Sequence, residues 1–333
     1  MKSIATIIKE KKINIFVNYA ILFFAFAASI RLFGTGADFN QYIRIFSDTS
    51  ISVEPAFALF RTIAIHLGGA NFVFFCFGIL SLSFIYQTIN EYSEYPSVTF
   101  IFYLLSFYLL HVYIQIRAAT AISIFFLSIN DLRDRNFKSY FIKTIVATSF
   151  HYSSLFMLVL YVFCKINKLR KFVSIPLFLF LFDFIFIYFL ENKFNVAIIL
   201  DWLAERQNNP IFSLVRMKIS YRGETLTLFN IQYLSFLVVL FAMYFTCIKN
   251  KKITKNELVI FKIFSFSLCC FFSILPTGLN VLVFRIPEFY LPVVVIALSM
   301  IIKHIKEKKI ALIIVISYVL LLFAMFISKI GVL

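Results

Sequence analysis

Long apolar runs separated by short polar segments make up most of this chain. A helix needs about 20 apolar residues to cross the hydrocarbon core of a bilayer. The runs lack the regular alternation of apolar and polar residues that a membrane β-barrel shows. The pattern therefore predicts an all-α, polytopic bundle of membrane helices. Full or nearly full spans are expected at residues 13–32, 71–88, 98–116, 172–190, 228–248, 258–275, 286–302 and 310–327.

Shorter apolar runs at 118–130, 140–150 and 153–164 are too short to assign by length alone. The segments 131–138 and 165–171 are both rich in lysine and arginine, and such segments stay in the cytoplasm. The chain between these two segments must therefore cross the membrane to the outer side and cross back, as two short helices. The outer apex of this hairpin contains His151.

The same rule gives about eleven helices, within a range of about 10–12, with the N-terminus in the cytoplasm. The other cytoplasmic segments are then 90–97, 249–255 and 303–309, the last of which makes His304 a surface residue. Segment 90–97 fits the rule poorly, because it carries two glutamates and no basic residue. We expect a single transmembrane domain over residues 1–333.

The composition agrees with a membrane protein. The chain is 62% hydrophobic and 14% charged, with a mean hydropathy of +0.92, whereas soluble domains are roughly 45–50% apolar. Its net charge of +16 comes mostly from lysine clusters at the ends of apolar runs, which topology and anionic lipid explain without a nucleic-acid partner. The cysteines show no metal-binding or redox spacing. We expect no cofactor and no metal.

Two predicted outer loops, 33–70 and 191–227, are long enough to contribute to an active site. In the first loop, Pro55 marks the start of a helix that is too short to span a membrane, and we expect an amphipathic helix lying at the outer interface. The second loop contains Arg216 and Tyr221. Loops of this length tend to be functional, so a lid or an acceptor-binding element is expected there.

The arginines are distributed differently from the lysines. Cytoplasmic charge is nearly all lysine, whereas most arginines lie near the outer ends of apolar runs. A planar guanidinium binds phosphate or carboxylate through two parallel hydrogen bonds, which a lysine cannot do. Arg117 lies between two apolar runs, and Arg285 lies in an apolar stretch near several Pro and Gly residues, so both are candidates for an anionic substrate. Arg31 and Arg61 could instead extend to lipid headgroups.

Some other polar residues have both a structural and a functional interpretation. His151 could be a packing histidine that is hydrogen-bonded across helices, or it could serve the site. Asp183 interrupts an apolar span and is expected to pair with a neighbouring helix. The sequence contains no phosphate-binding loop, no HExxH and no GxSxG, so these motifs do not identify the chemistry.

Several short motifs, taken in order, resemble the EpsG branch of the Wzy-like oligosaccharide repeat-unit polymerases. They are Gly36-Ala37-Asp38-Phe39-Asn40-Gln41-Tyr42, Glu54-Pro55, Arg117, Phe150-His151-Tyr152-Ser153-Ser154, and Arg285 followed by Tyr290. The resemblance covers most of the chain. Two positions depart from it, since the family commonly has Tyr where this chain has Phe39 and Gln where it has Ala118.

The resemblance implies a GT-C-like glycosyltransferase in the bacterial cytoplasmic (inner) membrane, with an active site that faces outward. Such enzymes join oligosaccharides linked to undecaprenyl pyrophosphate, giving the O-antigen of lipopolysaccharide, a capsule or an exopolysaccharide. The expected partners are these lipid-linked oligosaccharides, membrane lipid, and a chain-length regulator and a flippase of the same pathway.

The resemblance also implies roles for the candidate residues. Arg117 and Arg285 would bind the pyrophosphate, with Arg31 and Arg61 as auxiliaries. A developing phosphate charge needs fixed cationic donors, and an acceptor hydroxyl needs a base within hydrogen-bonding reach. The candidate catalytic bases, which the sequence does not rank, are Asp38, Glu54 and His151. The candidate sugar-binding residues are Tyr42, Tyr290, Arg216 and Tyr221.

Two alternatives remain open at this point. The first is a glycosyltransferase or acyltransferase that modifies a lipid-linked glycan once, which product size would separate from a polymerase. The second is a secondary transporter or lipid flippase, although the two halves of the sequence show no convincing internal repeat. A transporter should also place its charged residues near the middle of the membrane.

Overall fold

The computed structural model describes residues 4–32, 38–67, 69–168, 170–190, 228–249, 253–277 and 279–330, and within these ranges all regular structure is helical. Five helical stretches there are long and apolar enough to cross a membrane: Ala70–Tyr92, Ile231–Ile248, Lys255–Thr277, Val281–His304 and Lys308–Met325. The expected helical membrane protein is thereby confirmed. The count of about eleven spans and the GT-C-like arrangement stay predictions.

Contacts divide the chain into two compact units, Met1–Leu158 with Ile305–Leu333 and Val159–His304. The helices of the first unit are α1 (Ile4–Ser29), α2 (Phe39–Ser47), α3 (Pro55–Leu67), α4 (Ala70–Tyr92), α5 (Pro96–Phe107), a π-helix (Leu109–Ile114), α6 (Ile116–Asp134), α7 (Phe137–Phe150), a 3-10 turn (Tyr152–Phe156) and α16 (Lys308–Ile330). Helix α8 (Met157–Cys164) begins at the division between the units.

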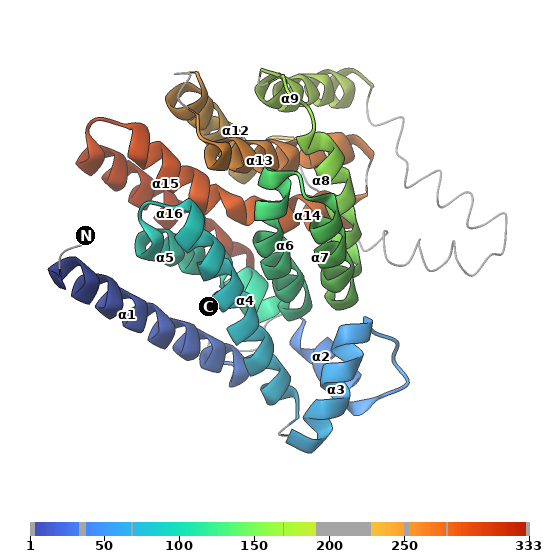
Figure 1. Cartoon of the computed structure of the whole chain (residues 1–333). Coiled ribbons are helices and arrows are strands. Elements are labelled where there is room, and N and C mark those ends of the chain that lie inside the picture. The colour runs from blue at the N-terminus through green and yellow to red at the C-terminus, as the bar shows by residue number, and fades with distance from the viewer. Residues whose placement is uncertain are drawn as a thin grey trace. The chain divides into compact units, whose positions relative to one another are not determined.

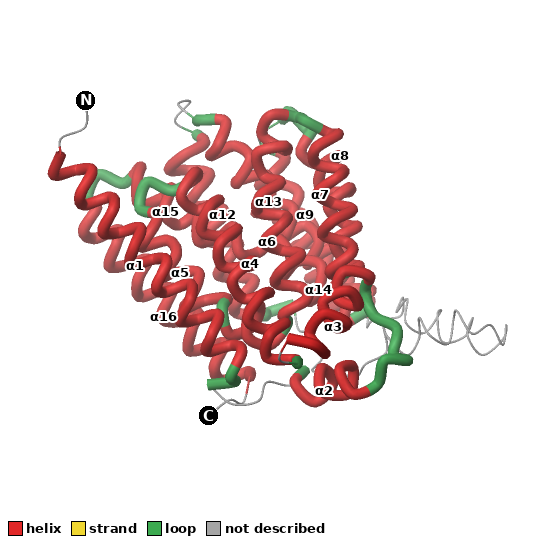
Figure 2. The backbone as a smooth tube through the Cα atoms, turned by 60° about the horizontal axis from the view of Figure 1, so that its bottom comes forward, coloured by secondary structure: helices red, strands yellow, loops and turns green. Residues whose placement is uncertain are grey.

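Helix α4 is central to the first unit, because it packs against both α1 and α6. The approach to α1 is close at Gly78, where a Cβ atom would lie 3.1 Å from the Cα of Ala25. Helices α6 and α7 run side by side as an antiparallel hairpin, and α2 and α3 lie at one end of α4, α6 and α7 (Figures 1 and 2). The expected helix 55–67 is therefore present as α3, accompanied by a second short helix, α2, in the same loop.

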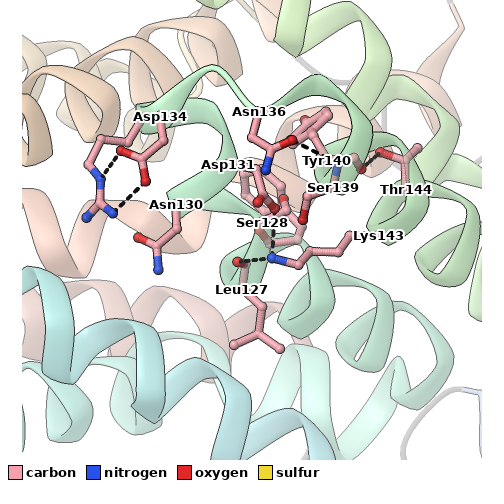
Figure 3. Close-up of polar contacts among 12 residues, drawn as sticks. Leu127, Ser128, Asn130, Asp131, Asp134, Asn136, Ser139, Tyr140, Lys143 and Thr144 are labelled. Carbon is pink, nitrogen blue, oxygen red and sulfur yellow. Dashed lines mark hydrogen bonds and ion pairs between the residues drawn. The ribbon is translucent and has the colours of Figure 1, made fainter.

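The turn between α6 and α7 is built from local capping interactions. Arg135 ends α6 in the left-handed region, with φ of 58°, and the Asn136 side chain accepts a hydrogen bond of 3.2 Å from the Ser139 amide at the start of α7. Figure 3 shows Lys143 reaching back from α7 to the Asp131 carboxylate at 2.7 Å and to the carbonyl of Leu127 at 3.0 Å. These bonds fix the hairpin at the end remote from His151.

The second unit contains α9 (Lys171–Leu190), α12 (Ile231–Met243), a π-helix (Tyr244–Ile248), α13 (Lys255–Ile274), a 3-10 turn (Leu275–Thr277), α14 (Asn280–Tyr290), a 3-10 turn (Leu291–Val293) and α15 (Val294–His304). Helix α13 packs against α9, α12, α14 and α15, so most of its length is buried. The apolar run 286–302 is not one regular helix, because Pro287 lies inside α14 and Pro292 lies in the 3-10 turn before α15.

His304, which was expected on the cytoplasmic surface, is half-buried. Its Nε2 lies 2.7 Å from a carboxylate oxygen of Glu257, which is almost fully buried. Glu257 also belongs to a capping box with Thr254 at the start of α13. The His304 side chain therefore joins the end of α15 to the start of α13.

Candidate active site

Three charged or titratable side chains meet at one end of the first unit. The Arg117 guanidinium donates through Nη1 to Oε2 of Glu54 at 2.6 Å, and His151 Nδ1 lies 3.4 Å from Oε1 of the same carboxylate. The Arg117 guanidinium also lies over the ring of Tyr42, at 5.5 Å from its centroid. We refer to Tyr42, Glu54, Arg117 and His151 as the Glu54 cluster.

Tyr42 lies within α2, and the other three members reach the Glu54 cluster from helix ends. Glu54 precedes Pro55, whose fixed φ suits the first position of α3. Arg117 lies in the first turn of α6, directly after the π-helix ends at Ile114. His151 follows the last residue of α7 in an extended conformation. Because α6 and α7 form an antiparallel hairpin, the start of one and the end of the other lie at the same end of the unit.

The surroundings of Glu54 favour its charged form. Burial alone would raise the pKa of this carboxyl, but the neighbouring His151 imidazole and the charge of Arg117 outweigh burial and hold the pKa below its ordinary value. Glu54 is 5% exposed, so its charge is compensated by protein groups more than by water. The Glu54 cluster therefore contains a buried carboxylate–guanidinium pair.

Tyr42 supplies a neutral hydroxyl beside that pair. Burial raises the pKa of Tyr42, and the nearby charge of Arg117 only partly opposes this effect. Its ring packs against Phe57 and Phe74 from α3 and α4, with centroids 6.0 and 5.6 Å away. The phenol is therefore rigidly held and stays protonated at neutral pH, ready to donate a hydrogen bond.

Some hydrogen-bonding atoms at this end of the unit have no partner among the described residues. They include Nε of Arg117 and the hydroxyl oxygen of Ser154, which is fully buried in the turn after His151. Buried polar atoms normally have partners, so these two atoms are free to form hydrogen bonds with a polar ligand.

The family model of the EpsG family matches residues 14–332, which is nearly the whole chain. The chain belongs to the EpsG family. No curated protein and no solved structure matches it. Membership agrees with the resemblance seen in the motifs, and it points to a polysaccharide polymerase-like role for this helical membrane protein.

The two other candidate arginines of the first unit have different partners from Arg117. Arg61 donates to the backbone carbonyls of Ile45, Thr49 and Ile51, each at 3.1 Å, and so holds the connector between α2 and α3. Arg31 follows α1 and donates through Nη1 to the carbonyl of Tyr113. The hydrogen bonds of Arg61 thus go to the protein backbone. In Arg31, Nε and Nη2 have no hydrogen-bond partner among the described residues.

The remaining candidates lie elsewhere. Asp38 is the residue before α2 and is half-buried, and its side chain makes no capping hydrogen bond to that helix. Arg285 and Tyr290 lie on α14 of the second unit, where the Tyr290 ring is fully buried against Phe266, with centroids 5.1 Å apart. Arg216 and Tyr221 lie outside the described residues, as do Gly36 and Ala37 of the first motif.

Among the described residues, no group of three or more His, Cys, Asp or Glu side chains could hold a metal ion. Two features of the candidate site were not predicted from the sequence. The π-helix leads directly into the helix that carries Arg117, and its residue Tyr113 supplies the carbonyl that Arg31 bonds. Ser154 is buried although it belongs to a polar apex. A π-helix has no clear sequence signal, but the serine could have been noted from its position in the motif that contains His151.

Proposed function

We propose that this member of the EpsG family polymerises oligosaccharide repeat units linked to undecaprenyl pyrophosphate on the outer side of the bacterial cytoplasmic membrane. The product would be a surface polysaccharide such as an O-antigen, a capsule or an exopolysaccharide. The observation that carries the proposal is the Glu54 cluster, in which a guanidinium, a carboxylate and an imidazole come together next to unpaired polar atoms.

The reaction has a simple bond balance. The acceptor hydroxyl oxygen forms a bond to the anomeric carbon of the growing glycan, and the bond between that carbon and the phosphate oxygen breaks. The electron pair leaves with the lipid pyrophosphate, and the hydroxyl proton passes to a base. Arg117, with Arg285 as a second candidate, would stabilise the negative charge that develops on the leaving group. Removing one such donor typically lowers the rate by about 10²–10³-fold.

The geometry favours His151 over Glu54 and Asp38 as the base. Glu54 has one oxygen bonded to Arg117 and the other beside Nδ1 of His151, so the carboxylate can orient the imidazole. An imidazole oriented through one ring nitrogen presents the other nitrogen to the substrate. Glu54 is then a positioning residue, and Nε2 of His151 is the atom that accepts the hydroxyl proton.

Other candidates complete the proposal. Tyr42 can hydrogen-bond a sugar from within the Glu54 cluster, and Tyr290, Arg216 and Tyr221 are proposed to contact saccharide. Arg31 and Arg61 are the auxiliary arginines. Membrane lipid surrounds the site, and a flippase and a chain-length regulator would act before and during elongation.

The test is the length of the glycan made in cells that lack the native gene and carry variants of this chain. Arg117→Ala and Arg117→Lys should both abolish the long-chain ladder and leave single repeat units, because lysine keeps the charge but not the two-pronged geometry. Arg44→Ala, on the exposed side of α2, is the matched control and should keep the ladder. A full ladder from Arg117→Ala, at normal protein level, would remove Arg117 from the mechanism.

A further inference from the structure

Arg31 lies in a cage of aromatic rings. Its guanidinium carbon lies 4.2 Å from the centroid of Phe74, 5.2 Å from that of Tyr113 and 5.3 Å from that of Phe39. These rings come from α4, the π-helix and α2. The Arg31 backbone has φ of 55°, in the left-handed region that disfavours residues other than glycine. The fold therefore keeps the guanidinium among these rings despite an unfavourable backbone conformation.

One edge of this guanidinium is unused. Nη1 donates to the Tyr113 carbonyl, but Nε and Nη2 are buried and have no hydrogen-bond partner among the described residues. The N–H bonds of Nε and Nη2 lie on the same edge of the planar group and point in parallel. That edge is the one with which an arginine binds two oxygens of a carboxylate or a phosphate at once.

The surrounding protein compensates the charge of Arg31 only weakly. The Tyr113 carbonyl is a neutral acceptor, the rings contribute cation–π attraction, and Asp38 acts only through a minor electrostatic interaction. A buried cation without a hydrogen-bonded anion is unfavourable, and the unfavourable energy is relieved when an anion binds. Arg117 differs, because its Nη1 is already bonded to a carboxylate of the protein, and Arg61 differs because backbone carbonyls take its hydrogen bonds.

The unused edge lies close to the Glu54 cluster. The Arg31 guanidinium lies 4.2 Å from the centroid of Phe74, and the Tyr42 ring of the cluster packs against the same Phe74 ring, with centroids 5.6 Å apart. We propose that Arg31 forms a second oxyanion subsite beside the Glu54 cluster, which takes the two oxygens of one substrate group on its Nε–Nη2 edge. This inference rests on the proposed function, since the oxyanion belongs to the lipid-linked saccharide. It is either a phosphate of the carrier or a carboxylate on a sugar.

The experiment uses the purified full-length chain in lipid nanodiscs, titrated by calorimetry with sodium pyrophosphate, with glucuronate and with neutral glucose at constant ionic strength. The unmodified chain should bind at least one of the two anions, and glucose should bind more weakly than that anion. Arg31→Lys, which keeps the charge and loses the paired N–H groups, should weaken that binding by about 10-fold or more. Arg44→Lys, an exposed arginine on α2, is the control and should bind as the unmodified chain does.

Each outcome decides something. Loss of pyrophosphate binding in Arg31→Lys assigns the subsite to the carrier, and loss of glucuronate binding assigns it to an acidic sugar. Equal anion binding by Arg31→Lys and the unmodified chain, or no anion bound better than glucose, overturns the subsite. Phe74→Leu keeps Arg31 and removes the nearest ring, so it should weaken anion binding even where Arg31→Lys does not fold. Unchanged binding by a folded Phe74→Leu chain would also count against the subsite.

The inference and the proposed function can fail separately. If Arg31→Lys binds anions normally while Arg117→Ala still abolishes the glycan ladder, only the subsite is wrong. If Arg31→Lys loses anion binding while Arg117→Ala keeps a full ladder, the subsite stands and the polymerase mechanism is wrong.

Discussion

The Glu54 carboxylate lies between Arg117 and His151 and is almost closed off from solvent. The contacts that hold the Glu54 cluster together therefore depend on the negative charge of this carboxylate. The pKa of this carboxyl is lowered in the folded chain. A carboxyl with a lowered folded-state pKa contributes stability above its unfolded pKa, which is about 4.3 for glutamate. That contribution is lost as the pH falls through the lowered, folded-state value.

Glu54→Gln should therefore lower the free energy of unfolding at neutral pH by about 1.5–3 kcal/mol, the usual range for a hydrogen bond to a charged group. The difference between the two chains should narrow as the pH falls below about 4. Denaturant unfolding in detergent micelles at a series of pH values measures both effects. A difference that stays constant from neutral to acid pH would contradict the assigned electrostatics.

At the residue scale, the sequence identified the members of the Glu54 cluster but not their contacts. A lone arginine between apolar runs must find a partner or a ligand in the membrane, which is why Arg117 was a sound candidate. The sequence treated Arg31 and Arg61 alike, because both follow or interrupt apolar segments. Their hydrogen bonds differ completely, and those depend on carbonyl positions that only the tertiary structure supplies.

At the scale of the elements, long spans were predictable and irregular ones were not. Helix α4 was expected at 71–88 and lies at Ala70–Tyr92, and the short helix after Pro55 was also expected. The π-helix at Leu109–Ile114 and helix α2 were not. The wider turns of a π-helix leave no periodic pattern of apolar residues in the sequence. Helix α2 has nine residues, which are too few for a reliable helical pattern.

The connector between α2 and α3 gives the prediction that belongs to this scale. Arg61 bonds the carbonyls of Thr49 and Ile51 within it and that of Ile45 near the end of α2, and the connector ends at Glu54. Arg61→Lys cannot bond all three carbonyls, so the connector should loosen. Hydrogen–deuterium exchange of the amides of residues 48–54 should rise about 10-fold or more, since one lost charged hydrogen bond is worth roughly 1.5–3 kcal/mol.

A chain with Arg31→Lys is the comparison for this measurement, because Arg31 bonds outside the connector. It should leave exchange at residues 48–54 unchanged. If Arg61→Lys also leaves exchange unchanged, its hydrogen bonds do not hold the connector and Arg61 returns to the candidates for anion binding.

At the scale of the whole molecule, the weakest point of the predicted topology was segment 90–97, which has no basic residue. In the first unit, Glu91 at the end of α4 pairs with Arg133 at the end of α6 at 2.9 Å, and Asn130 donates to the same carboxylate at 2.6 Å. The acidic segment therefore lies at the same end of the unit as the basic segment 131–138. Segment 90–97 therefore needs no lysine of its own, because Arg133 of the neighbouring helix α6 supplies the positive charge at this end.

The lengths of the helices also bear on how the site meets the membrane. Helix α7 has 14 residues, which at about 1.5 Å per residue is roughly 21 Å, less than the roughly 30 Å of a hydrocarbon core. If Asn136 lies at the cytoplasmic boundary, His151 lies below the outer boundary. The Glu54 cluster would then sit in a recess on the outer side, where low dielectric strengthens its electrostatic interactions.

Single cysteines at exposed positions test this topology. Tyr152→Cys and Arg44→Cys, both at exposed positions, should react with a membrane-impermeant maleimide added to intact cells. Lys138→Cys, at the opposite end of α7, should react only after the membrane is permeabilised. The unmodified chain, whose free cysteines are buried or partly buried, gives the background. Labelling of Lys138→Cys from outside would show that the first unit has the opposite orientation, with the Glu54 cluster on the cytoplasmic side, and would contradict the proposed outward-facing site.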